Sequence, residues 1–222
     1  MGVVKLTRES ILDGTFHASV RAGLGPSVRF VTDAERNAQV EAILAQAPRP
    51  GRIWVFAFGS LIWNPAFHFV ERRTARIHGF HRQFCLWARA GRGSAEKPGL
   101  MLSLVSGGSC TGVAYRLARR AAATELDVLW RREMATMAYR PVWATAHTPE
   151  GPEPAIAFSA NPAHERYVPG LAEEAVARYL ATGAGVMGRC CDYLFDTVAH
   201  LRQLGIRDRR LEALEKRVRA QQ

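Results

Sequence analysis

Apolar positions recur with helical spacing within residues 1–50 of the chain. Thr32 and Glu35 have the spacing of a capping box, which predicts the start of a helix. Val40 lies on the apolar stripe that follows, and a Pro-Arg-Pro-Gly run at 48–51 ends the pattern. Residues 1–50 are therefore predicted to form a helical N-terminal extension, followed by a main domain over residues 51–222.

The pattern changes to one typical of β-strands between residues 52 and 117. Residues 53–58 form a continuous apolar run with β-branched and aromatic members, which predicts a buried strand. Segments 74–88 and 99–105 follow as further predicted strands. Segment 110–116 is predicted to pair with 99–105 in a hairpin, because a Ser-Gly-Gly-Ser turn signal lies between them.

The rest of the chain begins with a mixture of helix and strand and then becomes helical. The predicted elements are a helix at 118–134, strands at 139–147 and 154–160, and helices at 171–183, 190–204 and 208–220. Asp208 is suited to cap the last of these helices. Strands that mostly precede helices favour an α+β fold, with a small mixed β-barrel, flanking helices and a helical C-terminal third.

Length and composition fit one domain with an appendage, because the chain has 222 residues of which 48% are hydrophobic. No apolar run approaches the ~20 residues that cross a bilayer. The N-terminus also lacks the long apolar region of a secretory signal. We therefore expect a cytoplasmic protein that has no membrane partner.

The formal net charge is +10, which raises the question of nucleic-acid binding. Nearly all of the positive charge is arginine, and the arginines are dispersed along the chain. No RNA-recognition, helix-turn-helix or zinc-finger pattern organises them. We expect no nucleic-acid partner, and a small anionic substrate fits the charge equally well.

The cysteines do not have the spacing of a zinc knuckle or a disulfide framework. There are four, with no C-x-x-C pair among them: Cys85, Cys110, Cys190 and Cys191. We expect them to be reduced and mostly buried thiols. The histidines are scattered, so the sequence predicts no metal site and no cofactor.

Phe58-Gly59-Ser60-Leu61 is the first place where chemistry is expected. A buried strand runs directly into a glycine here, and successive backbone N–H groups after such a turn can hold an anion. A substrate carboxylate or a developing oxyanion would suit this loop. The alternative is an ordinary strand-to-loop turn. Ser60 lacks a G-x-S-x-G context, so the nucleophile elbow of hydrolases is absent.

Glu133 is the second place, because it shares a helical stripe with Leu126, Leu129 and Trp130. Burial and the negative end of the helix dipole both raise the pKa of a carboxyl group there, which suits a proton shuttle. Arg131 and Arg132 are expected to point elsewhere. The alternative is a glutamate that reaches solvent or pairs with an arginine such as Arg89, Arg92 or Arg140.

Tyr139 is a weaker candidate, because it follows the helix of Glu133 closely and begins a predicted strand. Its hydroxyl group is suited to hydrogen-bond a ligand, and the alternative is that it packs at the edge of the sheet.

At these residues the chain resembles the ChaC-type, glutathione-specific γ-glutamylcyclotransferases. The matching motifs begin at residues 54–63, Trp-Val-Phe-Ala-Phe-Gly-Ser-Leu-Ile-Trp, and continue through Lys97-Pro98-Gly99-Leu100. They end with Arg132-Glu133, Tyr139, Asn161-Pro162 and the Asp192-Tyr193-Leu194 helix. The resemblance covers about residues 52–220, and several motifs in the same order make it specific.

The resemblance implies that residues 51–222 are a γ-glutamylcyclotransferase-like catalytic domain that cleaves glutathione to 5-oxoproline and cysteinylglycine. It implies Glu133 as general acid/base and assigns the γ-glutamyl group to the backbone N–H groups of Gly59, Ser60 and Leu61. The tyrosine of the family's loop is replaced by Phe58 here, so one hydroxyl group is lost. Two alternatives stay open, namely a cyclotransferase for other γ-glutamyl amines and a non-catalytic binding or regulatory protein linked to cation transport.

Overall fold

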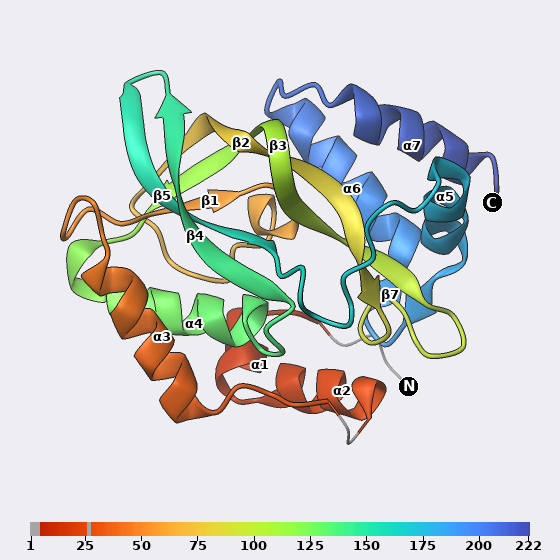
Figure 1. Cartoon of the computed structure of the whole chain (residues 1–222), viewed down its shortest axis with the longest axis horizontal. Helices are drawn as coiled ribbons and strands as arrows, with labels where there is room; N and C mark the ends of the chain where they lie inside the picture. Colours follow the sequence, from red (N-terminus) through yellow and green to blue (C-terminus); the bar gives the residue numbers. More distant parts are fainter. Residues whose placement is uncertain (1–4, 26–27) are drawn as a thin grey trace. The chain divides into compact units, whose positions relative to one another are not determined.

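Strands from the middle of the chain close into a barrel in the computed structural model, which describes residues 5–25 and 28–222 (Figure 1). The barrel order is β1-β3-β2-β4-β5, with a further pairing between β3 and β5. The strands are β1 (Trp54–Ala57), β2 (Glu71–Ala88), β3 (Gly99–Arg116), β4 (Tyr139–Thr148) and β5 (Gly151–Ala160). Together with the helices, this confirms the predicted α+β class with a small mixed barrel.

The short strand β1 lies between two partners. It runs antiparallel to β3, with Val55 opposite Tyr115, and parallel to β5, with Val55 opposite Ile156. All of its residues are buried. A strand covered on both faces needs a continuous apolar run rather than an alternating one, which is why the sequence pattern at 53–58 located it.

The predicted hairpin between segments 99–105 and 110–116 is wrong, because both belong to the single strand β3. β3 runs parallel to β5 at Leu104 but antiparallel to β1 at Val113, while β1 and β5 are themselves parallel. The strand must therefore change direction between these points. Gly107 and Gly108 have φ of 99° and 73° and make this bend, as glycines do at barrel corners.

The chain forms two compact units. Unit 2 comprises residues 30–83 and 103–161, and it holds the barrel pairings described above. Its helices are α3 (Asp33–Ala45), the short 3₁₀ helices η1 (Ser60–Ile62) and η2 (Arg119–Ala121), and α4 (Ala122–Glu133). The predicted helix at 118–134 thus begins with η2 and continues as α4.

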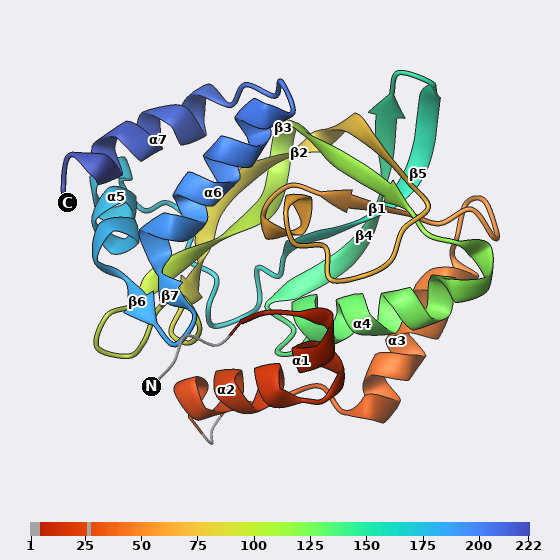
Figure 2. The ribbon, with the colours of Figure 1, turned by 180° about the vertical axis from the view of Figure 1, so that it is seen from behind.

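Unit 1 comprises residues 1–29, 84–102 and 162–222. Its elements are α1 (Arg8–Leu12), α2 (Thr15–Leu24), α5 (Glu173–Thr182), β6 (Ala184–Gly185), β7 (Gly188–Arg189), α6 (Cys190–Gln203) and α7 (Arg209–Arg219). Helices α5, α6 and α7 pack on one another, as Figure 2 shows from behind. The predicted extension 1–50 is divided between the two units, and residues 1–4 and 26–27 of it lie outside the described residues.

Local signals for helix ends are confirmed in both units. Thr32 and Glu35 form a reciprocal capping box at the start of α3, and the Asp208 side chain accepts the Leu211 N–H at the start of α7. All four cysteines are free and buried, as expected. None of the helices in residues 5–25 and 28–222 combines the length and apolar character that a membrane crossing requires.

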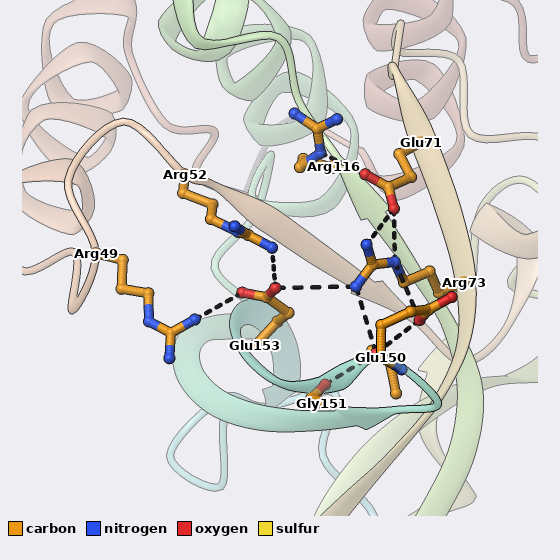
Figure 3. A network of polar contacts seen from close by, with 9 residues as sticks. Arg49, Arg52, Glu71, Arg73, Arg116, Glu150, Gly151 and Glu153 are labelled. Atoms are coloured by element: carbon orange, nitrogen blue, oxygen red, sulfur yellow. Dashed lines mark hydrogen bonds and ion pairs between the residues drawn. The ribbon is translucent and has the colours of Figure 1, made fainter.

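An arginine–glutamate network in unit 2 ties the chain that precedes β1 to the barrel strands (Figure 3). Glu153 on β5 is 4% exposed and pairs with Arg49 at 3.1 Å and with Arg52. Arg73 on β2 approaches Glu153 to 3.9 Å and pairs with Glu150 at 3.2 Å. Because a buried carboxylate is tolerated only among counter-charges and donors, these arginines make Glu153 an anchor for the entry into β1.

Candidate active site

The loop after β1 brings the first set of predicted site residues together. Phe58 and Gly59 are buried, and η1 begins at Ser60. The backbone N–H groups of Ile62, Trp63 and Asn64 close this turn by donating to Gly59 and Ser60 carbonyls. The earlier N–H groups of a helical turn have no partner inside that turn. The N–H groups of Gly59, Ser60 and Leu61 are therefore not used to close this turn, and their predicted binding of an anion stays a prediction.

Tyr115 supports this loop from β3. Its hydroxyl group donates to the backbone oxygen of Ile62 at 2.9 Å, and the side chain is 1% exposed. Burial raises the pKa of Tyr115 to about 12, so the phenol stays a neutral donor. The rings of Phe67 and Phe69 pack on Tyr115 with centroids 5.6 and 4.7 Å away. The exit of the loop is thereby fixed to a rigid strand.

Glu133 is the last residue of α4 and lies at the C-terminal end of the stripe predicted for it. Leu126, Leu129 and Trp130 are at most 1% exposed, and the Glu133 side chain is 15% exposed. Burial raises the pKa of Glu133 above its ordinary value, while the charge and hydrogen bond of Arg132 oppose that rise. A carboxyl group in this setting can both accept and return a proton nearer neutral pH.

Arg132 joins Glu133 to the loop. Its side chain is 4% exposed. The Nε atom lies 2.9 Å from Glu133 Oε1, and Nη2 donates to Ser60 Oγ at 2.8 Å. Its Nη1 donates to the backbone oxygen of Asn64. One side chain therefore fixes the carboxyl group, the serine hydroxyl group and the end of the loop. A serine oxygen that accepts from a cation is a poor nucleophile, which agrees with the missing elbow motif.

The expectation that Arg132 points elsewhere was wrong. The buried face of α4 is wider than the predicted stripe, because Glu125, Val128 and Arg132 are buried as well, and from that face the long Arg132 side chain extends to the loop. Arg131 instead pairs with Asp127 at 2.8 Å on the same helix. Among the described residues, the ion pair of Glu133 is with Arg132 and not with the arginines that the sequence offered as partners, Arg89, Arg92 and Arg140.

A tight turn over residues 134–138 leads from Glu133 to Tyr139, the first residue of β4. Met137 in this turn has φ of 61°, a left-handed conformation that is costly for a residue with a side chain. Asn161 holds it in place, because its Nδ2 donates to the Met137 backbone oxygen at 3.0 Å. Tyr139 is half-buried and pairs with Ala160 of β5.

Ser60 and Glu133 are thus brought together through Arg132, with Gly59 and Leu61 beside Ser60 in the chain. Sequence reasoning gave no role in the site to Arg132 or to Tyr115. Arg132 stood next to the predicted acid in the sequence, and a polar donor inside the buried strand pattern at 110–116 was the signal for Tyr115. Within residues 5–25 and 28–222, no three His, Cys, Asp or Glu side chains gather in the manner of a metal site.

Comparison with known proteins places this arrangement in a family. A model of the ChaC-like protein family matches residues 53–221. A glutathione-specific gamma-glutamylcyclotransferase of Escherichia coli K12 is 42% identical over 175 residues, which cover 78% of this chain and 76% of that protein. A human glutathione-specific gamma-glutamylcyclotransferase 1 is 31% identical over 159 residues, which cover 68% of this chain and 72% of that protein.

A crystal structure of a yeast gamma-glutamyl cyclotransferase specific to glutathione has the same fold. It superposes with a TM-score of 0.69 at 22% identity and covers 76% of this chain and 96% of the yeast chain. The fold, the family match and the relatives agree with the motifs around Ser60 and Glu133. The chain therefore belongs to the ChaC-like protein family.

Proposed function

We propose that this protein is a glutathione-specific γ-glutamylcyclotransferase with Glu133 as its general acid/base. The relatives in the ChaC-like family support the reaction and the substrate. The observation that carries the assignment of the acid is the buried contact chain from Ser60 through Arg132 to Glu133, with distances of 2.8 and 2.9 Å. It links a carboxyl group of raised pKa to a loop suited to hold an anion.

The reaction is an intramolecular transfer. The α-amine of the γ-glutamyl group attacks its own γ-carbonyl carbon, a ring C–N bond forms, and the bond to the cysteinyl nitrogen breaks. Glu133 takes the proton that the ammonium group loses and returns it to the departing amine, so that 5-oxoproline and cysteinylglycine leave without any water being consumed. Because Arg132 engages Oε1, the proton transfers fall to Oε2. General acid–base help of this kind contributes about 10²–10⁴-fold.

The loop binds and orients the γ-glutamyl group in this proposal. The backbone N–H groups of Gly59, Ser60 and Leu61 donate to its carboxylate or to the oxyanion that forms on the γ-carbonyl. Holding the amine against its own carbonyl reduces the entropic part of the barrier. Phe58 is proposed to belong to the same substrate-binding loop, where it contributes a buried ring in place of the tyrosine of the family's loop. Tyr139 is proposed to contact the substrate from the start of β4.

We further propose that residues 51–222 are the catalytic domain, since the family match begins at residue 53. A cytoplasmic location is proposed as well. Free, buried thiols at all four cysteines are the state expected in a reducing compartment, and they support that location.

The test is a substrate panel in which 5-oxoproline and the released amine are measured together. The proposal expects equal amounts of 5-oxoproline and cysteinylglycine from glutathione, and much slower turnover of other γ-glutamyl amines and amino acids. Turnover of those amines without turnover of glutathione would contradict the substrate assignment. A protein that binds glutathione but releases neither product would instead be a binding or regulatory protein.

A further inference from the structure

Helix α3 lies outside the segment that matches the family, yet it packs along the helix that carries Glu133. The family match begins at residue 53, whereas α3 spans Asp33–Ala45. Figure 1 and Figure 2 both show α3 and α4 side by side, and both helices belong to unit 2. Three separate contacts connect α3 and the chain just before it to α4 and to the turn that follows α4.

The first contact is a partly buried ion pair between the two helices. Arg36 is 7% exposed, and its Nε lies 2.5 Å from Asp127 Oδ1 on α4. Its Nη1 lies 2.6 Å from Asp33 Oδ1, and Asp127 also pairs with Arg131. Burial raises the pKa of Asp127, but the hydrogen bonds from Arg131 and Arg36 outweigh it and hold that pKa below the ordinary value. The pair therefore stays ionised and holds α3 against α4.

The other two contacts reach the turn at 134–138 directly. The Val31 backbone N–H donates to the Ala135 backbone oxygen at 2.9 Å. The Gln39 side chain donates through Nε2 to Met137 Sδ at 3.4 Å. Met137 is the residue held at a φ of 61°. A non-glycine residue keeps such a conformation only where its surroundings determine it, and here those surroundings include α3.

We propose that α3, together with Val31, is a positioning element that braces the turn at 134–138 and so fixes the direction of the Glu133 side chain toward the loop. Arg36 sets the placement of α4, while Val31 and Gln39 hold the turn between Glu133 and Tyr139. The proposal rests on the proposed function, because it assigns α3 a part in that reaction. It gives the N-terminal segment a role in turnover rather than in substrate binding.

The expected effect follows from where the contacts act. The loop that holds the γ-glutamyl group is supported by Tyr115 from β3 as well as by Arg132 from α4. Loss of the brace therefore changes the placement of the acid more than that of the binding loop, which keeps its support from β3. A displacement of about 1 Å in a reacting group costs up to ~10²-fold in rate. We expect Arg36→Met to lower kcat by about 10-fold or more while KM changes by less than about 2-fold.

The test compares Arg36→Met with Arg52→Met in the full-length protein. Arg52 also pairs with a buried carboxylate of unit 2, Glu153, and this partner belongs to β5 rather than to α4 or the turn (Figure 3). Arg52→Met should keep the wild-type kcat at a temperature where both variants are folded. Arg36→Lys, which keeps the cation, should restore part of the lost kcat. Equal losses in the two Met variants, or a folded Arg36→Met with wild-type kcat, would overturn the proposal.

Two further measurements keep the test decisive. Amide hydrogen exchange at Val31 and Met137 should be faster in Arg36→Met than in Arg52→Met, and unchanged exchange would overturn the brace whatever the activity. If Arg36→Met does not fold, Gln39→Ala replaces it. Gln39→Ala should lower kcat by about 2-fold with unchanged KM, and wild-type kinetics would overturn the proposal. A wild-type protein that is inert on glutathione contradicts the proposed function, while the exchange data still decide the brace.

Discussion

Arg132→Met removes the group that joins the acid to the binding loop. The substitution deletes the charge pair with Glu133 and the donations to Ser60 Oγ and the Asn64 backbone oxygen, and it keeps much of the apolar stem. Arg132→Lys is the matched variant, because it keeps the charge but loses the planar fork that reaches three acceptors at once. The two variants separate the electrostatic part of the role from the geometric part.

The magnitudes follow from the burial of the pair. Breaking a buried ion pair by removing one partner costs about 3–5 kcal/mol of unfolding free energy. For a chain of 222 residues this corresponds to a fall in Tm of about 6–20 °C. Because Arg132 lowers the pKa of Glu133 against the effect of burial, its removal lets that pKa rise further. The ionised base then forms only at higher pH, and kcat at neutral pH falls by about 10²-fold.

The assay is the pH profile of kcat/KM for 5-oxoproline release from glutathione, recorded at a temperature where all three proteins are folded. The acid limb should move to higher pH in Arg132→Met and stay close to the wild-type position in Arg132→Lys, whose kcat is nevertheless reduced. An acid limb at the wild-type pH in Arg132→Met would refute the claim that Arg132 controls the ionisation of Glu133. An equal displacement in both variants would refute the electrostatic explanation.

Three other outcomes are expected. Burial raises the pKa of Glu133 above its ordinary value of 4.5, so its ionisation weakens the fold progressively as pH rises above that value. In thermal melts, the Tm of Glu133→Gln relative to that of wild type should therefore increase from about pH 4 upward. A difference in Tm that is the same at every pH would contradict the raised pKa of Glu133. Tyr115→Phe removes the 2.9 Å hydrogen bond to Ile62, so it should cost about 0.5–1.5 kcal/mol and raise the KM for glutathione. A fall in kcat with unchanged KM would argue against that role. An alanine Cβ at Gly112 would lie 2.2 Å from the Ala57 backbone oxygen, so Gly112→Ala should separate β1 from β3 and cost about 1–3 kcal/mol in chemical denaturation. A denaturation midpoint of Gly112→Ala equal to that of wild type would show that the two strands accommodate the added methyl group.

The sequence was sufficient to predict those features of the fold that depend on residues close together in the chain. The capping box at Thr32 and Glu35 and the apolar run of β1 need no distant contact to be recognised, and both are confirmed. The helical spacing that placed Leu126, Leu129 and Trp130 on one buried stripe is confirmed for the same reason, since one helix sets its own faces, and Glu133 at the end of that stripe is half-buried. The family resemblance supplied the reaction that this spacing does not imply.

The features that the sequence did not predict depend on contacts between residues that are far apart in the chain. The Ser-Gly-Gly-Ser signal is compatible with a hairpin turn and with a bend inside a long strand, because both need positive φ at glycine. Only the pairing of β3 with β1 and β5 selects the bend at Gly107 and Gly108. Arg132 was misjudged because its acceptors, Ser60 and the Asn64 backbone, are distant in sequence and helical spacing says nothing about them.

The most direct test of the account measures 5-oxoproline release from glutathione by wild type, Glu133→Gln and Glu125→Gln. Glu125 is a matched control, because it is a buried glutamate of the same helix that accepts the His68 backbone N–H at 2.9 Å. We predict that wild type and Glu125→Gln release 5-oxoproline, while folded Glu133→Gln loses about 10²-fold or more of the rate. A Glu133→Gln variant that matches wild type would contradict the assignment of Glu133 as the acid/base.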